Sequence, residues 1–235
     1  MAKQANYGPP KTRQHPALVV LTAIVLIVAV LALLARTGVL RSTGVSAEGV
    51  TRVLVVAASP DESGDVVGQI VMIVDLTTQP ASLEALSPAL HVSIPGTTYA
   101  TLGDAYPFGG GAGTAAALAS ARDEAPLPYV ALTADELVRA VEAAGGMRVT
   151  LPAPMSVFDG RDLFTFKAGE QTLSAPRLQA VLKGAPYLAD AQREALDVSL
   201  AEGLAVVLAA EPGVLTGATR TDLAPDALER LAAAM

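Results

Sequence analysis

The stretch from Tyr129 to Met155, YVALTADELVRAVEAAGGMRVTLPAPM, decides how the rest of the chain is interpreted. Its first four residues are apolar, and Thr133 follows them with Glu136 three residues later, the pattern of a helix capping box. Two glycines end the predicted helix, because glycine takes the left-handed conformation at a helix C-terminus with little strain. Alternating apolar and polar residues from Met147 onward then predict a half-buried strand. The stretch therefore predicts a strand, a helix and a second strand.

Apolar runs elsewhere in the chain predict further strands. Residues 52–58 (RVLVVAA) and 70–75 are almost continuously apolar, which is typical of central strands buried on both faces. Residues 82–86 are predicted to pair back as a hairpin. Strands are also predicted over residues 90–94 and 163–167, and loops over 99–113 and 211–217. Helices are predicted over residues 114–122, 174–183, 187–210 and 225–235. The apolar stripe predicted for the helix at 187–210 consists of Leu188, Ala191, Ala195 and Val198. Because strands alternate with helices, we predict an α/β domain whose mixed central sheet is flanked by helices.

Composition limits the chemistry open to the chain. It has no cysteine and two histidines in 235 residues, which excludes disulfides and Cys-based metal sites and disfavours a His-based cluster. Five of its 16 Lys and Arg residues lie in the first 41 residues, where no acid occurs, which leaves 11 basic residues against all 23 acidic ones. Nucleic-acid binding requires Lys and Arg against the phosphate backbone. We therefore expect no nucleic-acid partner and no metal-binding residues.

Residues 17–35 form an uncharged apolar run of 19 residues. As a helix this run would span about 28 Å, close to the hydrocarbon thickness of a bilayer. A cleaved signal peptide is the alternative, but the run is long for one and no A-x-A site directly follows it. We predict a cytoplasmic tail over residues 1–16, a single-pass transmembrane helix over 17–35, a linker over 36–50 and an extracytoplasmic domain over 51–235. Basic residues on both sides of the helix give this orientation little further support.

Six segments occur in an order that resembles a LytR-CpsA-Psr (LCP) domain over about residues 51–235. They are SIPGTT (93–98), DAYPFGGGAGT (104–114), the stretch from Tyr129 to Met155, FKAGEQTL (166–173), DAQREAL (190–196) and TRTDLAPDALERLA (219–232). The resemblance implies a bacterial membrane-anchored protein with one N-terminal helix and an extracytoplasmic domain. It also implies binding of a polyprenyl-pyrophosphate-linked glycopolymer and its transfer to peptidoglycan as a phosphodiester. The protein would then act in cell-wall and envelope assembly at the cell membrane.

The chain departs from the LCP pattern at positions to which the resemblance assigns chemistry. Residues 96–97 are Gly-Thr where the family has Arg-Asp, and residues 68–69 are Gly-Gln where it has Asp-Thr. Pro60 stands near the place of a further aspartate, although Asp61 is adjacent. Phosphoryl transfer from a pyrophosphate requires cations that hold the phosphates, and carboxylates that bind Mg²⁺ or act as base. We therefore predict no catalytic residue.

Two cations remain as candidate ligand-binding residues. Lys183 replaces the family's arginine at the end of a capped helix, and Arg193 keeps the second position of an Arg-x-x-Arg pair whose first position is Asp190. Lysine lacks the planar, two-pronged geometry with which arginine holds phosphates. The alternative for Lys183 is a solvated cation at a helix C-terminus. The alternative for Arg193 is an intrahelical ion pair with Asp190 or Asp197.

Three functions remain open. The first is a degenerate LCP-like protein that binds a polyprenyl-phosphate-linked membrane lipid, or another envelope-assembly protein, without catalysing transfer. The second is an active phosphotransferase that attaches a glycopolymer to peptidoglycan; Asp61, Asp65, Lys183 and Arg193 would then converge, and Mg²⁺ is expected as a cofactor only in this case. The third is a scaffold that binds no small molecule and is the partner of an active relative.

Overall fold

The structure, a computed structural model, describes residues 45–235. The predicted cytoplasmic tail, the predicted transmembrane helix and most of the predicted linker lie outside these residues. Within residues 45–235, no helix combines the length and the apolar character needed to cross a bilayer. The domain predicted over residues 51–235 is covered in full.

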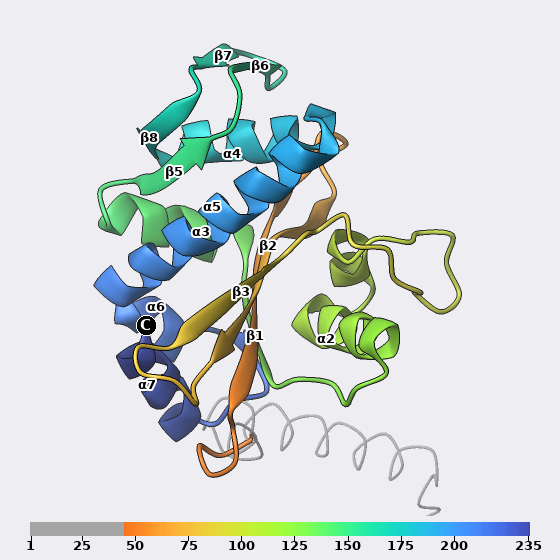
Figure 1. The fold of residues 1–235 in the computed structure, drawn as a ribbon, viewed down its shortest axis with the longest axis vertical. Coiled ribbons are helices and arrows are strands. Elements are labelled where there is room, and N and C mark those ends of the chain that lie inside the picture. The colour runs from red at the N-terminus through yellow and green to blue at the C-terminus, as the bar shows by residue number, and fades with distance from the viewer. Residues whose placement is uncertain (1–44) are drawn as a thin grey trace, which may run out of the picture. The chain divides into compact units, whose positions relative to one another are not determined.

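A mixed five-stranded sheet forms the centre of the domain (Figure 1). Its strands are β1 (Arg52–Pro60), β2 (Val66–Asp75), β3 (Ser82–Leu86), β4 (Tyr129–Leu132) and β9 (Arg220–Thr221), in the order β3-β2-β1-β4-β9. β1 is antiparallel to β2 and parallel to β4. β2 and β3 pair antiparallel, so the predicted hairpin is confirmed. The mixed α/β architecture predicted from the sequence is confirmed as well.

Helices cover both faces of this sheet (Figure 1). One face carries η2 (Gly103–Phe108) and α2 (Gly110–Arg122). The other face carries α3 (Ala134–Ala143), α4 (Ala175–Gly184), α5 (Asp190–Ala210), α6 (Pro212–Thr216) and α7 (Pro225–Ala234). A short turn of helix, η3 (Ala185–Tyr187), joins α4 to α5. The sheet is therefore buried between two helical layers.

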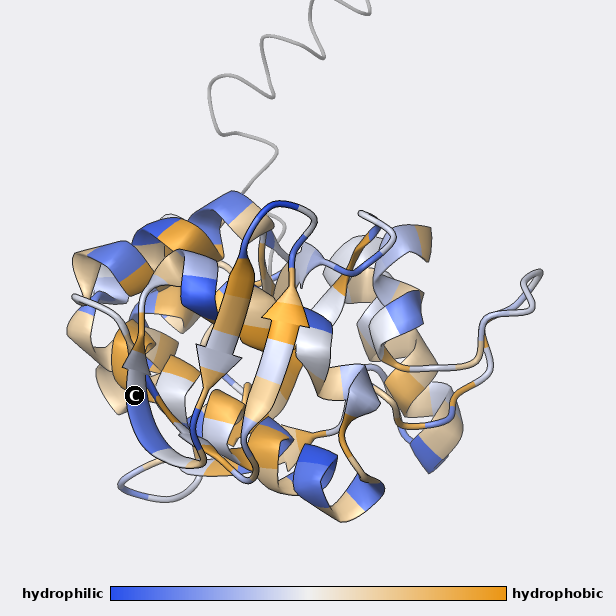
Figure 2. Ribbon diagram, turned by 90° about the horizontal axis from the view of Figure 1, so that it is seen from above, coloured by the Kyte–Doolittle hydropathy of each residue, from blue (hydrophilic) through white to orange (hydrophobic). Residues whose placement is uncertain are grey.

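The two-sided burial explains the sequence of β1. Val53 and Val55 pack in the layer with α3, α4 and α5, whereas Leu54 and Val56 pack in the layer with α2. A strand covered on both faces has no solvent-facing positions, so it is apolar throughout. Figure 2 shows hydrophobic residues along the central strands, while the surrounding helices carry both hydrophobic and hydrophilic residues.

The unit that begins at Tyr129 forms as its sequence predicts. The Thr133 hydroxyl accepts a hydrogen bond from the Glu136 N–H (3.2 Å), and the Glu136 carboxylate accepts one from the Thr133 N–H (2.8 Å), which confirms the capping box. The two glycines after α3, Gly145 and Gly146, have φ angles of 75° and 118°. The strand that follows, β5 (Met147–Leu151), is separate from the central sheet and pairs antiparallel with β8 (Gly169–Leu173).

α5 covers the other edge of β5. The Ser199 hydroxyl accepts a hydrogen bond from the Thr150 N–H (2.7 Å), which satisfies a donor that an edge strand would otherwise expose. A Cβ atom at Gly203 would lie 2.4 Å from the carbonyl oxygen of Arg148. Only glycine therefore allows the helix to lie this close to the strand.

Several predicted elements are wrong in detail. Residues 90–94 form a loop, and a single bridge joins His91 to Thr101. The alternation that predicted a strand there arises because Val92 and Ile94 are buried in the layer with α2. The long helix begins at Asp190 rather than at residue 187. The loops predicted over 99–113 and 211–217 contain η2, the start of α2, and α6, and the predicted strand at 163–167 is β7 (Leu163–Phe166), paired with β6 (Met155–Phe158).

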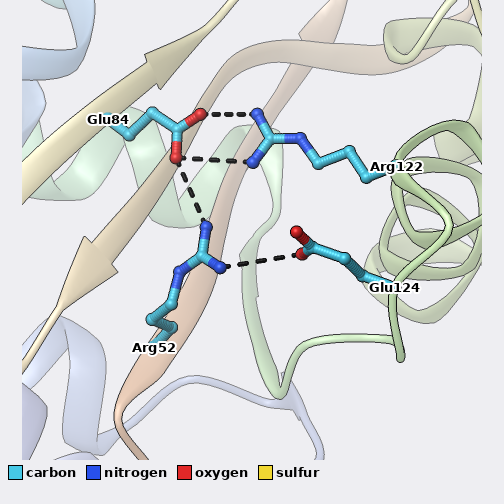
Figure 3. A network of polar contacts seen from close by, with 4 residues as sticks. All are labelled: Arg52, Glu84, Arg122 and Glu124. Carbon is cyan, nitrogen blue, oxygen red and sulfur yellow. Dashed lines mark hydrogen bonds and ion pairs between the residues drawn. The ribbon is translucent and has the colours of Figure 1, made fainter.

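Arg52 and Arg122, between which the chain has no Lys or Arg, meet at one carboxylate (Figure 3). Glu84 on β3 accepts hydrogen bonds from Arg122 at the end of α2 and from Arg52 at the start of β1 (3.4 Å). Arg52 also pairs with Glu124 at 3.6 Å. The hydrogen bond from Arg122 is the main reason that the pKa of Glu84 lies below its usual value. The cluster connects α2 to the outer strand of the sheet.

The first described residues are fixed to the C-terminal part of the domain. The Val45 N–H donates to the carbonyl of Asp222 (2.7 Å), and the Val45 carbonyl accepts from the Ala224 N–H (2.9 Å). The Arg230 side chain donates to the carbonyl of Ala47 (2.9 Å). The chain is therefore held against the segment between β9 and α7 before it enters β1.

Candidate functional site

The two candidate ligand-binding residues, Lys183 and Arg193, line different cavities. Lys183 lies at the C-terminal end of α4 and lines a cavity of about 600 Å³, named here the Lys183 cavity. Arg193 lies in the first turn of α5 and lines a cavity of about 330 Å³, named here the Asp197 pocket. η3 contributes residues to both, with Tyr187 in the first and Pro186 in the second. The two cations therefore line neighbouring cavities that meet at η3.

The Lys183 cavity has one wall made by the β6–β7 hairpin. Met155, Val157 and Phe158 supply apolar surface on this wall, and the side chain of Phe158 is 65% exposed. Gly184 allows the end of α4 to approach the hairpin, because a Cβ there would lie 2.5 Å from a methyl group of Val157. The cavity thus combines an apolar wall with the ammonium group of Lys183.

Acidic groups of the Lys183 cavity are engaged by neighbours. The Asp159 carboxylate accepts hydrogen bonds from the backbone N–H groups of Asp162 and Arg161, which lower its pKa, with a smaller contribution from Lys183. Glu62 accepts a hydrogen bond from the Tyr187 hydroxyl. In the part of the chain that the structure describes, Lys183 forms no ion pair.

The Asp197 pocket lies where the turn after β1, the start of β2, η2 and α5 meet. Its polar lining comes from Asp61, Gln69, Thr101, Asp104, Arg193 and Asp197. Gly68 also lines it, so the positions at which the LCP resemblance places Asp-Thr and the second arginine do converge here. The substituted positions 96–97 and Lys183 are outside its lining.

Asp197 is the most buried charged group of this pocket. Its side chain belongs to a residue only 8% exposed, and its Oδ2 has no hydrogen-bond partner among the described residues. Burial raises the pKa of Asp197 to about 6, against the opposite effects of the Ser87 hydroxyl and of Arg193. A carboxylic acid with this pKa is mostly ionised at neutral pH.

The other charged groups of the pocket are committed to local contacts. Arg193 forms an ion pair with Asp190, which confirms the intrahelical pair proposed as the alternative for this residue. Asp61 accepts hydrogen bonds from the Ser63 and Asp65 N–H groups within its turn (2.8 and 3.0 Å). Asp104 accepts one from the Thr101 hydroxyl (2.6 Å). These carboxylates surround a cavity rather than one point.

The residues present do not fit a bound Mg²⁺ ion. Across residues 45–235, no group of three acidic or His side chains is arranged to hold a metal. Magnesium requires near-octahedral oxygen ligands at about 2.1 Å. Asp61 and Asp104 instead accept hydrogen bonds from neighbouring residues. Of the four residues that the active-transferase hypothesis brings together, Asp61 and Arg193 line the Asp197 pocket, Lys183 lines the other cavity, and Asp65 lines neither.

Sequence reasoning missed Asp104 and Asp197. The stripe predicted for the long helix was wrong, because Ala191, Ala195 and Val198 are exposed. The buried stripe consists of Leu196, Leu200, Leu204, Val207 and Leu208. Asp197 lies three residues before Leu200 and seven before Leu204, so the correct stripe would have marked it as an acid on the buried face.

No family model and no curated protein matches the sequence. Solved structures do match. TagV of B. subtilis has a TM-score of 0.52 at 16% identity, with 77% of this chain and 78% of TagV covered. TagT bound to LIIa-WTA has a TM-score of 0.51 at 17% identity, with 78% and 73% covered. A protein of Enterococcus faecalis described as a transcriptional regulator has a TM-score of 0.53 at 20% identity, with 78% and 70% covered.

TagT is described as a LytR-CPS2A-psr family protein. The described domain therefore has the LCP fold. The expectation about the fold that came from the six segments is confirmed, since the match covers more than three quarters of this chain. In this LCP-fold domain the Asp197 pocket combines three carboxylates with one arginine, and that arginine is already paired.

Proposed function

We propose that this chain is a membrane-anchored protein of bacterial cell-wall and envelope assembly that binds a polyprenyl-phosphate-linked lipid and does not catalyse its transfer. The LCP fold, shared with TagT that was captured with LIIa-WTA, supports a place in glycopolymer assembly. The apolar run over residues 17–35 would anchor the chain with its N-terminus in the cytoplasm and its main domain outside.

The charge of the Asp197 pocket is the observation on which the absence of transfer rests. Transfer requires preorganised cations at the phosphates. The pocket instead offers Asp61, Asp104 and Asp197, and its arginine is paired with Asp190. Two like charges about 4 Å apart at an effective dielectric constant of about 20 repel by about 4 kcal/mol. A pyrophosphate is therefore disfavoured there.

The Lys183 cavity is the site that we propose for the lipid. Its lysine forms no ion pair among the described side chains, and the carboxylates of the same cavity, Asp159 and Glu62, accept hydrogen bonds from other neighbours, so the lysine can bind one phosphate. Phe158 and Leu163, paired across the β6–β7 hairpin, are 65% and 67% exposed. Exposed apolar groups next to a cation suit an amphiphile that has a phosphate and an isoprenoid chain.

Native mass spectrometry of the detergent-extracted full chain tests lipid binding. We expect a co-purified polyprenyl phosphate with the wild-type chain and its loss with Lys183→Ala. Lys167→Ala is the matched control, because Lys167 is exposed and lies outside the cavity lining. Absence of lipid from the wild type, or equal loss with both variants, would contradict the proposed site.

A transfer assay with lipid-linked glycan and peptidoglycan tests the absence of catalysis. We expect no product from the purified chain. Product formation that Arg193→Ala or Lys183→Ala abolishes would overturn the proposal and establish an active glycopolymer–peptidoglycan phosphotransferase.

A scaffold that binds no small molecule is the second candidate. The layer between the sheet and α3, α4 and α5 supports it, because fully buried Val and Leu side chains occupy that layer. Such a scaffold would bind an active relative and would do so equally well with Lys183→Ala. Crosslinking of wild type and Lys183→Ala to an envelope-assembly partner separates the two candidates, since only the lipid-binding candidate depends on Lys183.

A further inference from the structure

One oxygen of the Asp197 carboxylate, Oδ2, has no hydrogen-bond donor among the described residues. The residue is 8% exposed. A buried acceptor without a donor is costly, and the cost is larger for a charged group. Asp197 lines the Asp197 pocket, so a ligand that enters the pocket approaches this carboxylate.

The charges around Asp197 favour a positively charged ligand. Asp61 from the turn after β1 and Asp104 from η2 line the same pocket. The guanidinium group of Arg193 is held by Asp190, which is outside the pocket lining. Three carboxylates therefore face one arginine in this pocket, and this excess of negative charge favours a cation.

The shape of the pocket favours an organic cation over a metal ion. Its carboxylates are spread over a volume of about 330 Å³, which is in the range of small-molecule sites, and the described residues contain no group suited to one metal ion. Pro88, Pro186 and Leu200 add apolar surface to the lining. An aliphatic stem can pack on such surface while its charged end is hydrogen-bonded.

We propose that the Asp197 pocket binds a primary alkylammonium group, with the ammonium at the Asp197 carboxylate and the methylene stem along Pro88, Pro186 and Leu200. An ammonium group has three N–H donors and no acceptor, which matches a buried carboxylate oxygen without a donor. This inference goes beyond the proposed lipid binding, because it concerns a different cavity and a ligand of opposite charge.

Calorimetric titration of the full chain in a non-ionic detergent at pH 7.5 tests this site. The probes are 1-aminopentane and Nα-acetyl-lysine methylamide, with 1-pentanol as the neutral isostere. We expect both amines to bind with Kd on the order of 1 mM and pentanol to bind much more weakly. Tight binding of the lysine amide indicates a lysine of a partner protein as the natural ligand, whereas binding of aminopentane alone indicates a free amine; either result supports the site.

Three variants locate the binding. We expect Asp197→Asn to weaken both amines roughly tenfold or more, because it removes the charge of a charge-assisted hydrogen bond. Asp61→Asn keeps an oxygen for its turn hydrogen bonds and is expected to weaken binding by a smaller factor. Glu202→Gln, on the same helix but outside the pocket lining, is the matched control and is expected to leave binding unchanged.

Four results would overturn the proposal. They are equal affinity for pentanol and aminopentane, amine binding that survives Asp197→Asn, a site that takes MgCl₂ but neither amine, and no amine binding at concentrations of about 10 mM. None of these results bears on the lipid at Lys183, which native mass spectrometry measures separately.

Discussion

Replacing Asp197 by asparagine is expected to stabilise the domain, by an amount that depends on pH. The folded state raises the pKa of this carboxyl from 3.8 to about 6, mainly through burial. When folding raises the pKa of an acid, the ionised acid lowers the free energy of unfolding. This loss is absent below the pKa of the unfolded state and complete above the pKa of the folded state. A difference of about two pKa units lowers the free energy of unfolding by about 3 kcal/mol at pH 8 and by about 0.5 kcal/mol at pH 4.

Urea unfolding of wild type and Asp197→Asn at pH 4, 6 and 8 measures this difference. We expect the variant to have the larger free energy of unfolding, with the gain growing as pH rises. Arg193, Glu194, Asp61 and Asp104 are the same in both proteins, so the comparison isolates the change at position 197. A gain that is the same at all three pH values, or a loss of stability at pH 8, would refute the conclusion that burial of the Asp197 charge destabilises the folded domain.

Three further substitutions test the packing, the caps and the ion cluster. Gly203→Ala is expected to lower the free energy of unfolding of the domain by about 1–2 kcal/mol, because the new Cβ would meet a backbone carbonyl on β5. Gly213→Ala is the control: a Cβ there would have nothing within 4 Å, so urea unfolding is expected to show no change. Thr133→Ala is expected to lower the melting temperature, since a lost cap costs about 1 kcal/mol; an unchanged melting temperature would contradict the capping box. Glu84→Gln is expected to cost about 0.5–1 kcal/mol at low salt and almost nothing in 1 M salt, and a salt-independent loss would argue against the cluster.

Short sequence patterns predicted the elements that are specified by residues close to them in the chain. The capping box at Thr133 and the glycines after α3 lie within a few residues of the structure that they specify, so both were predicted from the sequence. The pairing of β5 with β8 was not predicted from the sequence. It depends on a strand more than a dozen residues away and on α5, which covers the other edge of β5. The order of the six segments, by contrast, predicted the LCP fold.

The candidate site was predicted only in part. The resemblance placed Gly68 and Arg193 at related positions, and both do line one pocket. Lys183 lies at the end of α4 and lines a different cavity, beside the β6–β7 hairpin, whose position no sequence pattern predicted. Asp197 was missed because the small residues of α5 were assigned to the wrong face of the helix.

The attachment of Val45 to the segment after β9 has a mechanical consequence. A force applied through the residues before Val45 acts first on the two hydrogen bonds that Val45 forms with Asp222 and Ala224. These bonds form a parallel bridge between Val45 and Leu223. β1, which runs through the middle of the sheet, is loaded only after those bonds have broken. Tension along the preceding chain would thus separate residues 45–47 from the segment between β9 and α7 and leave both cavities intact.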